Sequence, residues 1–390
     1  MWVNLALSAT GWLLGWISIA LAPGRMLPRS RLGIPKSGDR RRSSQENGLG
    51  DETRIVRRVA VLIPARDEAA RLSHLLSCCI GLPPQWEVLV ADDNSTDGTA
   101  DVAHEFGVKV VQVPPLPEGW LGKPWACWNA VLSTDADLLV FLDSDVEFDA
   151  DVLVSMAESL GDGRALTVQP WHWAPTFSEE FSSWFNLMVW LGTRSIATSN
   201  HGGFGPCLFV SRVDYLRVGG HQVVAREVLE NHHLTSVLAA SGIRVEQMVG
   251  TDSLRFRMYS GGWSEVVRGW SKHFVLGARE TPSLKLVVLV VWIAGAGAGF
   301  TQWLKTLVWL SGPRSSFIPF EMATVILISY ITQLRVALRC VGSFRWYTAV
   351  AYPLYLVSFL LIVVRTLLLG QRVQVWKGRF VGSDARGGRR

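Results

Sequence analysis

Long apolar runs lie towards both ends of the chain, and shorter patterned segments lie between them. The runs Trp2–Gly24, Leu286–Leu304 and Trp346–Val364 contain no charged residue. Each can span a hydrocarbon core of about 30 Å at about 1.5 Å per residue. The segment Ser315–Leu334, apolar except for one glutamate and several hydroxyls, could be a span or an interfacial helix. The pattern predicts an integral membrane protein with one polar block, residues 55–281.

Within the polar block, strand-like and helix-like patterns alternate. Short apolar runs that stop at polar or breaking residues predict buried strands, and apolar residues at helical spacing predict helices. The predicted order is strand Val59–Ile63, helix Glu68–Cys79, strand Glu87–Ala91, helix Gly98–Phe106, strand Val108–Val113, helix Trp125–Leu132 and strand Asp137–Leu142. Such alternation with right-handed crossovers predicts an α/β fold with a mostly parallel sheet.

The basic residues indicate how the chain is oriented in the membrane. None precedes the first apolar run, whereas seven lie between residues 25 and 42. Although Ala20-Leu21-Ala22 is similar to a signal-peptide cleavage site, the positive-inside rule favours an uncleaved anchor, residues 1–24, with its N-terminus outside. Residues 25–54 are then a basic flexible linker. We therefore expect a multi-pass protein of the cell (inner) membrane whose polar block is cytoplasmic.

The C-terminal region, residues 282–390, is expected to hold two or three membrane helices and a basic tail. The charge of the tail favours two crossings, while the cluster Arg335, Arg339 and Arg345 favours three. These flanks account for most of the net charge of +5, so the charge needs no nucleic acid to explain it. The five cysteines have no metal-like spacing and are expected to be free thiols.

Acidic residues follow three of the predicted strands. They lie in Pro64-Ala-Arg-Asp-Glu68, in Asp92-Asp-Asn-Ser-Thr-Asp-Gly98 and in Asp143-Ser-Asp145. In a doubly wound sheet the carboxyl ends of the strands meet in one crevice, where ligands bind. An Asp-x-Asp sequence there can hold a hard divalent cation that is shared with a substrate's phosphates. The second loop also fits a helix N-cap and a tight turn, but capping needs only one of its polar residues.

Taken in this order, the three segments resemble glycosyltransferase family 2, whose catalytic domain has the GT-A fold. Further motifs resemble the membrane-bound branch that contains the carotenoid (diaponeurosporenoate-type) and hopanoid-associated glycosyltransferases. These motifs are Gly119-Trp-Leu-Gly-Lys-Pro-Trp-Ala126, Phe204-Gly-Pro-Cys-Leu208, Gly219-Gly-His221, Phe256-Arg-Met-Tyr259 and Gly269-Trp-Ser-Lys272. The resemblance covers about residues 59–277, and it implies a GT-A domain over residues 55–281.

The resemblance also implies roles for individual residues. Nucleoside contacts would come from Pro64, Arg66, Glu68 and either Asp92 or Asp93. Asp143 and Asp145 would bind the nucleotide sugar, UDP- or GDP-linked, through Mg²⁺ or Mn²⁺, and Lys123 would reach its diphosphate or ribose. A metal ion and a lysine suit this chemistry because the departing nucleoside diphosphate develops negative charge.

One position departs from the family pattern. Members usually carry Leu-Glu-Asp on the acceptor side, with the aspartate as the base, whereas this chain has Val228-Leu-Glu-Asn-His-His233. The amide of Asn231 cannot take a proton. An inverting transfer could use Glu230, His232 or His233 instead, or an acceptor carboxylate or phosphate that is already ionised. The third alternative is an inactive scaffold.

The acceptor is expected to come from the bilayer. Residues 169–193 contain Trp171, Trp173, Trp184 and Trp190. Tryptophan favours the headgroup layer, and the alternative for any single one of them is a place in a core. The chain lacks the Gln-x-x-Arg-Trp signature of processive synthases, so a single transfer to a lipid or polyprenoid acceptor is expected. A polyprenyl phosphate is the alternative acceptor. Arg257, Arg268 and Lys272 either bind phosphate or face the membrane.

Overall fold

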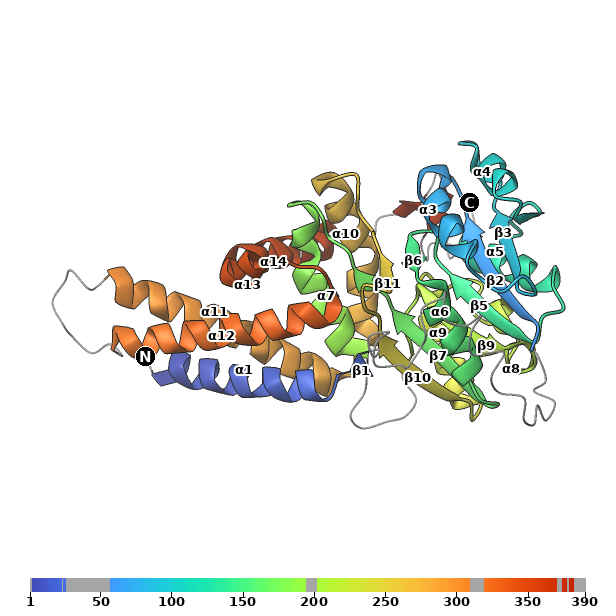
Figure 1. The fold of residues 1–390 in the computed structure, drawn as a ribbon. Helices are drawn as coiled ribbons and strands as arrows, with labels where there is room; N and C mark the ends of the chain where they lie inside the picture. Colours follow the sequence, from blue (N-terminus) through green and yellow to red (C-terminus); the bar gives the residue numbers. More distant parts are fainter. Residues whose placement is uncertain are drawn as a thin grey trace, which may run out of the picture.

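The computed structural model describes residues 2–22, 24–25, 57–193, 202–308, 319–369, 374–376 and 379–381. An α/β domain forms one end of the molecule, and long helices extend from the other (Figure 1). The predicted basic linker and most of the basic tail lie outside the described residues. Strands β12 (Gln374–Trp376) and β13 (Arg379–Val381) pair with each other near the α/β domain.

The central sheet of the described residues has eight strands in the order β1-β10-β7-β9-β5-β2-β3-β4. Strand β9 is antiparallel to its neighbours β5 and β7, and all other neighbours are parallel. The predicted α/β fold with a mostly parallel sheet is therefore confirmed. The strands are β1 (Gly24–Arg25), β2 (Val59–Ala65), β3 (Glu87–Asp92), β4 (Lys109–Gln112), β5 (Leu138–Leu142), β7 (Arg164–Gln169), β9 (Cys207–Ser211) and β10 (Arg244–Val249).

Helices cover both faces of this sheet, which explains why its inner strands are apolar throughout. Side chains alternate between the faces, so Val61 and Ile63 pack in one core and Ala60 and Leu62 in the other. The first core includes residues of α3 (Ala69–Cys79) and α6 (Ala150–Ser159). The second includes residues of α5 (Gly122–Leu132) and α9 (Glu230–Ala240). Helix α4 (Thr99–Glu105) packs beside α3, and the short helix α8 (Arg212–Arg217) follows β9.

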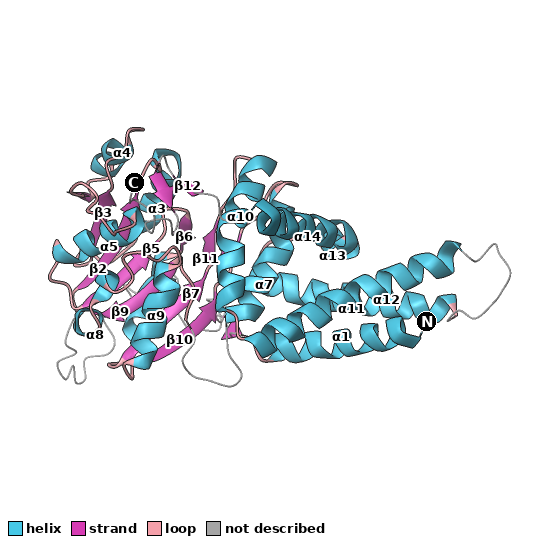
Figure 2. Ribbon diagram, turned by 180° about the vertical axis from the view of Figure 1, so that it is seen from behind, coloured by secondary structure: helices cyan, strands magenta, loops and turns pink. Residues whose placement is uncertain are grey.

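A second, three-stranded sheet lies between the central sheet and the helical end (Figure 2). It consists of β6 (Val146–Phe148), β8 (Trp171–His172) and β11 (Leu254–Phe256). Strand β6 starts directly after Asp145, so this sheet fixes the chain on the far side of the Asp-x-Asp sequence. Helix α7 (Ser183–Thr193) and helix α10 (Trp263–Glu280) join the two ends of the molecule.

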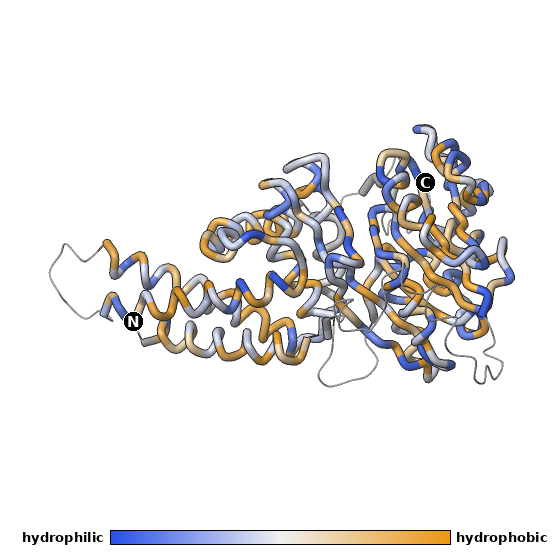
Figure 3. The backbone as a smooth tube through the Cα atoms, in the orientation of Figure 1, coloured by the Kyte–Doolittle hydropathy of each residue, from blue (hydrophilic) through white to orange (hydrophobic). Residues whose placement is uncertain are grey.

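Three helices extend side by side from the α/β domain: α1 (Trp2–Ala20), α11 (Ser283–Val308) and α12 (Phe320–Val341). Each is long and apolar enough to cross a membrane, and hydrophobic residues recur along their whole length (Figure 3). Glycines allow α1 and α11 to approach closely, because a Cβ at Gly295 would lie 2.8 Å from the Leu7 carbonyl oxygen. Small contact residues and interhelical hydrogen bonds are typical of membrane helices, and here Tyr330 donates to the Ser8 carbonyl at 2.7 Å.

The last two helices differ from the prediction. Trp346–Val364 is not one helix but two, α13 (Trp346–Val350) and α14 (Tyr352–Leu369), and α14 contacts α7 and α10. The break occurs because Pro353 lacks an N–H group and fits only the first turn of a helix. Conversely, the segment predicted over Ser315–Leu334 forms the span-length helix α12, although residues 315–318 lie outside the described part.

Candidate active site

Backbone hydrogen bonds hold the Asp-x-Asp loop from two directions. It follows β5, at the carboxyl edge of the sheet where β2 and β3 also end. The Asp143 N–H donates to the carbonyl of Pro206 at 3.0 Å, and the Arg257 N–H donates to the carbonyl of Asp145 at 3.2 Å. Both carboxylates are therefore carried by a loop that is fixed by the segment before β9 and by β11.

The loops after β2 and β3 are tied to each other. Asp97 accepts hydrogen bonds from the first N–H groups of two helices, Ala69 of α3 at 3.0 Å and Thr99 of α4 at 3.1 Å. Asp67, with a φ of 50°, accepts from the Thr96 N–H at 2.8 Å. The expected capping role thus belongs to Asp97, and neither Asp67 nor Asp97 was among the predicted site residues. The two loops form one preorganised unit.

Asp92 and Asp93 are both buried behind this unit. Arg66 donates to the Asp93 carbonyl at 2.8 Å and lies 3.5 Å from its carboxylate, so the predicted residues Arg66 and Asp93 are in contact. Asp92 accepts from the Ser95 N–H at 3.2 Å and lines a pocket of about 570 Å³ together with residues of the β3–α4 loop. Pro64 lies in β2, opposite Ala91 of β3.

Lys123 connects the Asp-x-Asp loop to helix α9. Its ammonium nitrogen lies 2.6 Å from Asp143 Oδ1 and 2.7 Å from Glu230 Oε1. Burial alone would lower the pKa of Lys123, but the negative charges of Asp143 and Glu230 raise it well above its usual value. Lys123 is positioned by the first turn of α5, which starts three residues earlier than the predicted helix. Three predicted site residues from three different elements therefore converge.

Asp145 lies in an excess of negative charge. Burial, followed by the charge of Asp143, raises the pKa of Asp145 to about 7, although the charge of Arg71 acts in the opposite direction. Arg71 itself pairs with Glu68 at 3.5 Å and with Glu265. An added cation would favour the ionised form of Asp145, so the local charge suits a metal ion.

Asp143 and Asp145 fit a metal ion that is shared with a substrate. No group of three or more His, Cys, Asp or Glu residues among the described ones is arranged to hold a metal alone. Mg²⁺ usually keeps several waters and is bound through one or two carboxylates together with substrate phosphates. Asp143 and Asp145 offer the two carboxylates that this mode requires.

Asn231 is oriented by the backbone rather than towards a substrate. Its Nδ2 donates to the carbonyl of Gly205 at 2.5 Å, and its side chain is buried. The neighbouring carbonyl, of Pro206, accepts the Asp143 N–H. Asn231 also forms a hydrogen bond with His221, which raises the pKa of that imidazole. Burial and the charge of Lys123 have the larger effect and lower the pKa to about 3, so His221 is neutral. Asn231 thus supports the loop that holds Asp143.

Comparison with known proteins identifies the family to which the chain belongs. The model of the family described as "Glycosyl transferase family 2" matches residues 60–215. The 4,4'-diaponeurosporenoate glycosyltransferase of Staphylococcus aureus strain USA300 is 32% identical over 333 residues, which cover 82% of this chain and 87% of the relative. The same enzyme from strain MRSA252 is 33% identical over the same coverage. The chain belongs to glycosyl transferase family 2.

This family 2 member is therefore a glycosyltransferase with a GT-A catalytic domain. Among solved structures it is similar to the mannosyltransferase PcManGT from Pyrobaculum calidifontis, in complex with GDP-Man and Mn²⁺. That match has 18% identity and a TM-score of 0.46, and covers 92% of this chain and all of the other. Glucosyl-3-phosphoglycerate synthase from Mycobacterium tuberculosis, with Mn²⁺, UDP and phosphoglyceric acid, has 20% identity and a TM-score of 0.36 over 52% of this chain and 71% of the other.

Among the predicted bases of the glycosyltransferase, Glu230 contacts Lys123. His232 lies against the Gly202–Gly203 segment, where its Nδ1 is 3.2 Å from the Gly203 carbonyl oxygen. His233 Nε2 lies 3.4 Å from a carboxylate oxygen of Glu227. The two histidines thus contact other groups in the described part of the chain.

Of the two alternatives for the four tryptophans, the headgroup layer or a core, two of the residues take the core. Trp184 and Trp190 are buried, and Trp184 packs against Trp292 with ring centroids 5.6 Å apart. Their helix, α7, is enclosed by α10, α11, α12 and α14, so these rings fill a core. Trp171 is half-buried and donates to the Arg339 carbonyl at 3.4 Å. Trp173 is also half-buried, beneath Arg255 and Arg257 at 5.1 and 5.3 Å.

The three basic residues expected to bind phosphate or face the membrane have different surroundings. Arg257 pairs with Glu179 at 2.8 Å, so its charge is already compensated. Arg268 is exposed on α10, and the side chain of Lys272 lies outside the described atoms.

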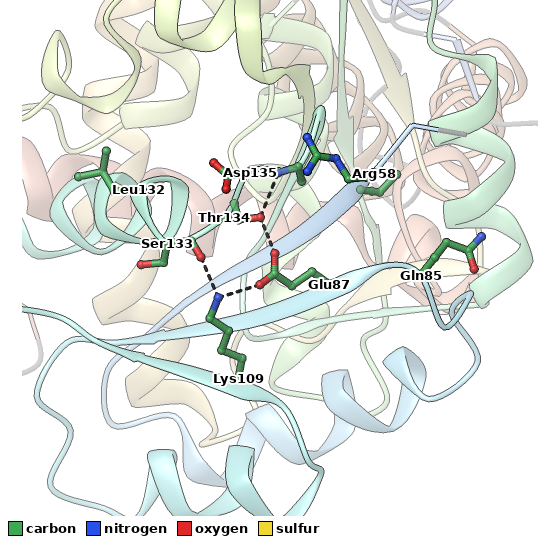
Figure 4. Close-up of a pocket in the computed structure, with 10 residues that line it drawn as sticks. Arg58, Gln85, Glu87, Lys109, Leu132, Ser133, Thr134 and Asp135 are labelled. Atoms are coloured by element: carbon green, nitrogen blue, oxygen red, sulfur yellow. Dashed lines mark hydrogen bonds and ion pairs between the residues drawn. The ribbon is translucent and has the colours of Figure 1, made fainter. Parts of the chain in front are cut away.

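A pocket of about 460 Å³ at the opposite edge of the sheet is a poor candidate for the site (Figure 4). It lies where β3 and β4 begin, and two of its charged groups, Glu87 and Lys109, are paired with each other. Lys109 lies 2.8 Å from Glu87 and donates to the Ser133 carbonyl at 2.8 Å, while Thr134 donates to Glu87 at 2.5 Å. No acidic excess is present there to attract a metal or a cationic group.

Proposed function

We propose that this glycosyltransferase moves a sugar, with inversion, from a nucleoside diphosphate to an ionised lipid acceptor of carotenoid-like chemistry. The observation that carries the proposal is the Lys123 bridge, because it links Asp143 of the donor loop to Glu230 at the start of α9. A positive charge held between these elements lies where a departing diphosphate must be stabilised.

The donor half would bind the nucleotide sugar through three groups of residues. Arg66, Asp92 and Asp93 offer polar groups for the nucleoside. Asp143 and Asp145 would hold Mg²⁺ or Mn²⁺, which as a Lewis acid would neutralise charge on the diphosphate oxygens. In the reaction, the bond between the anomeric carbon and the diphosphate oxygen breaks. Lys123 then compensates part of the charge that remains on the leaving group.

The residues on the acceptor side, Glu230 and Asn231, favour an acceptor oxygen that is already ionised. Asn231 uses its donor group on the Gly205 carbonyl and cannot accept a proton, and Glu230 is paired with Lys123. A carboxylic acid of ordinary pKa, roughly 4, is deprotonated at neutral pH and needs no base. The S. aureus relatives are named for a carboxylate acceptor, 4,4'-diaponeurosporenoate, which supports this choice. A polyprenyl phosphate would meet the same requirement.

An apolar acceptor would reach the site from the bilayer. Helices α1, α11 and α12 expose large hydrophobic side chains, among them Leu13, Val290 and Val325, which is the surface a lipid-facing helix requires. With the positive-inside rule applied to the linker, the catalytic domain lies on the cytoplasmic face of the cell membrane.

The test uses purified full-length enzyme in detergent with UDP- and GDP-sugars, Mn²⁺, and three acceptors. These are a carotenoid carboxylic acid, its methyl ester and the corresponding alcohol, and a polyprenyl phosphate is assayed in parallel. We expect a glycosyl ester from the acid, no product from the ester, and no product with EDTA or with Asp143→Asn. Transfer to the alcohol at a comparable rate would contradict the ionised-acceptor mechanism, and transfer only to a polyprenyl phosphate would favour the second acceptor.

A further inference from the structure

Tyr259 follows β11 and lies beside the Asp-x-Asp loop. The backbone that leads to it is tied to this loop, because the Arg257 N–H donates to the carbonyl of Asp145 at 3.2 Å. The same backbone is tied to the neighbouring basic residue, since Arg71 donates to the carbonyl of Met258 at 3.3 Å. Tyr259 is therefore fixed next to the proposed metal ligands by the small sheet and by α3.

The hydroxyl group of Tyr259 is buried and has no hydrogen-bond partner among the described residues, and the side chain as a whole is 6% exposed. The charges nearest to it are those of Asp145, Glu265 and Arg71. Burial, followed by the first two of these charges, raises the pKa of the phenol, so it keeps its proton and remains a donor. An unsatisfied buried donor costs free energy, and such groups are rare in native structures.

Packing holds the ring in this position. A Cβ at Gly269 would overlap the Tyr259 ring, so the absence of a side chain on α10 makes room for the phenol. Trp270 meets the ring edge-to-face with centroids 5.6 Å apart and stacks on Phe185 at 4.7 Å. Trp270 also donates to Ser182 at 2.9 Å. The unpaired hydroxyl thus belongs to a well-packed side chain and not to a loose one.

We propose that the Tyr259 hydroxyl donates a hydrogen bond to the diphosphate of the nucleotide donor, which completes the donor site from the side of α10. This inference rests on the proposed function. An ionised diphosphate offers several strong acceptor oxygens, and it would be held at Asp143 and Asp145 beside this phenol. The bond strengthens as charge develops on the leaving group, so Tyr259 contributes to turnover as well as to binding.

The experiment compares Tyr259→Phe with wild type in the full-length protein. Affinities for UDP, GDP and dTDP are measured by calorimetry with Mn²⁺, and thermal unfolding is followed with and without nucleotide. We expect about tenfold weaker nucleotide binding, because the variant loses one hydrogen bond to a charged group. The Tm without nucleotide should be unchanged or higher, because the variant removes an unpaired buried hydroxyl.

Tyr352→Phe is the matched control, because its hydroxyl donates to the Ala296 carbonyl at 2.9 Å within the helical region. It should lower the Tm and leave nucleotide affinity unchanged. Gly269→Ala provides a second test, because it displaces the Tyr259 ring without altering it and should also weaken nucleotide binding.

Nucleotide affinity of Tyr259→Phe equal to wild type would overturn the inference. So would an equal loss of Mn²⁺ affinity without nucleotide, because the hydroxyl would then act on Asp145. Failure of the wild-type enzyme to bind any of the three nucleotides would instead overturn the proposed function, and this inference with it.

Discussion

The two edges of the central sheet both carry charged residues but use them differently. At the amino edge, Glu87 and Lys109 pair with each other and with nearby hydroxyl and carbonyl groups (Figure 4). At the carboxyl edge, Asp143 and Glu230 share one lysine, and the phenol of Tyr259 has no partner among the described residues. Glu87 and Lys109 at the first edge thus compensate each other, whereas at the second edge we propose that a substrate and a cation complete the arrangement.

The comparison shows that the presence of a pocket alone is a poor guide to function. The pocket at the amino edge has about 460 Å³ and the one beside Asp92 about 570 Å³, so the two are similar in size. In the amino-edge pocket Glu87 and Lys109 already pair with each other, so a ligand that binds either group would have to break this bond. At the carboxyl edge, burial and Asp143 hold the pKa of Asp145 near 7, which is an unfavourable environment for a carboxylate without a counter-ion. Incompletely compensated charge therefore distinguishes the carboxyl edge, where we propose the active site.

Removing the lysine at each edge should have the largest effect and separate the edges most clearly. We expect Lys123→Met to lower the transfer rate by about 10²–10³-fold, as for the loss of one transition-state donor. Lys109→Met should change the rate by less than about threefold, because its exposed ion pair is worth about 0–1 kcal/mol. The measurement is kcat/KM for sugar transfer, with circular dichroism to check folding. Equal losses in the two variants would abolish the distinction between the edges.

Asn231→Asp tests whether the carboxyl edge lacks a base or has no need of one. A carboxylate at this position would place an oxygen in place of Nδ2, 2.5 Å from the Gly205 carbonyl oxygen. We expect a loss of about 1–3 kcal/mol in stability and a roughly tenfold loss of activity, because two acceptors would face each other in a buried place. Denaturant unfolding and transfer assays measure the two effects. A gain of activity would show instead that the missing base limits the enzyme.

The pH dependence of stability should distinguish Asp145 from the paired carboxylates. Its folded pKa of about 7 exceeds the value of about 3.9 in an unfolded chain. Between these values the folded state binds more protons, so this group lowers stability as pH rises from about 4 to 7. In metal-free protein, Asp145→Asn should therefore become more stable than wild type over this window, as measured by Tm between pH 5 and 8. Parallel curves for the two proteins would refute the raised pKa.

The smallest expected effect is that of Glu87→Gln at the amino edge. Although burial acts in the opposite direction, hydrogen bonds from Lys109 and Thr134 lower the pKa of Glu87, so its charge is well compensated. We expect a change in unfolding free energy of about 1 kcal/mol or less and normal transfer. Urea denaturation and the transfer assay provide the comparison, and a large loss of activity would indicate that this edge takes part in function.

Sequence patterns predicted the convergence of the three acidic loops well because its signals are local. Each acidic loop follows a short apolar strand directly, and parallel strands bring such loops together. The pairing of Lys123 with Glu230 could not be predicted from spacing, because it depends on where α9 packs. Arg71, Glu265 and Tyr259 were missed as site residues for the same reason, although Tyr259 lies in a motif that carried the family resemblance.

The helical region was harder to predict because apolar sequence has several meanings. Tryptophans such as Trp184 and Trp190 occur both in buried cores and at membrane surfaces, so their sequence does not distinguish the two places. The helices that pack around α7 show that these two residues lie in a core. The break before α14 was detectable in the sequence, since Pro353 lies inside the predicted helix. At such positions the residue type alone does not tell whether a side chain is buried in a core or lies at a membrane surface.

The close packing of α1 against α11 has a consequence for how the chain is made. Ser8 donates to the Gly295 carbonyl at 3.3 Å, and these residues are 287 positions apart. At about 5–20 residues per second, the ribosome needs roughly 15–60 s to supply the second helix after the first. During that interval the glycine-lined face of α1 lacks the partner helix that it contacts in the folded enzyme. Biogenesis of this enzyme therefore includes a waiting period in which other molecules cover that face.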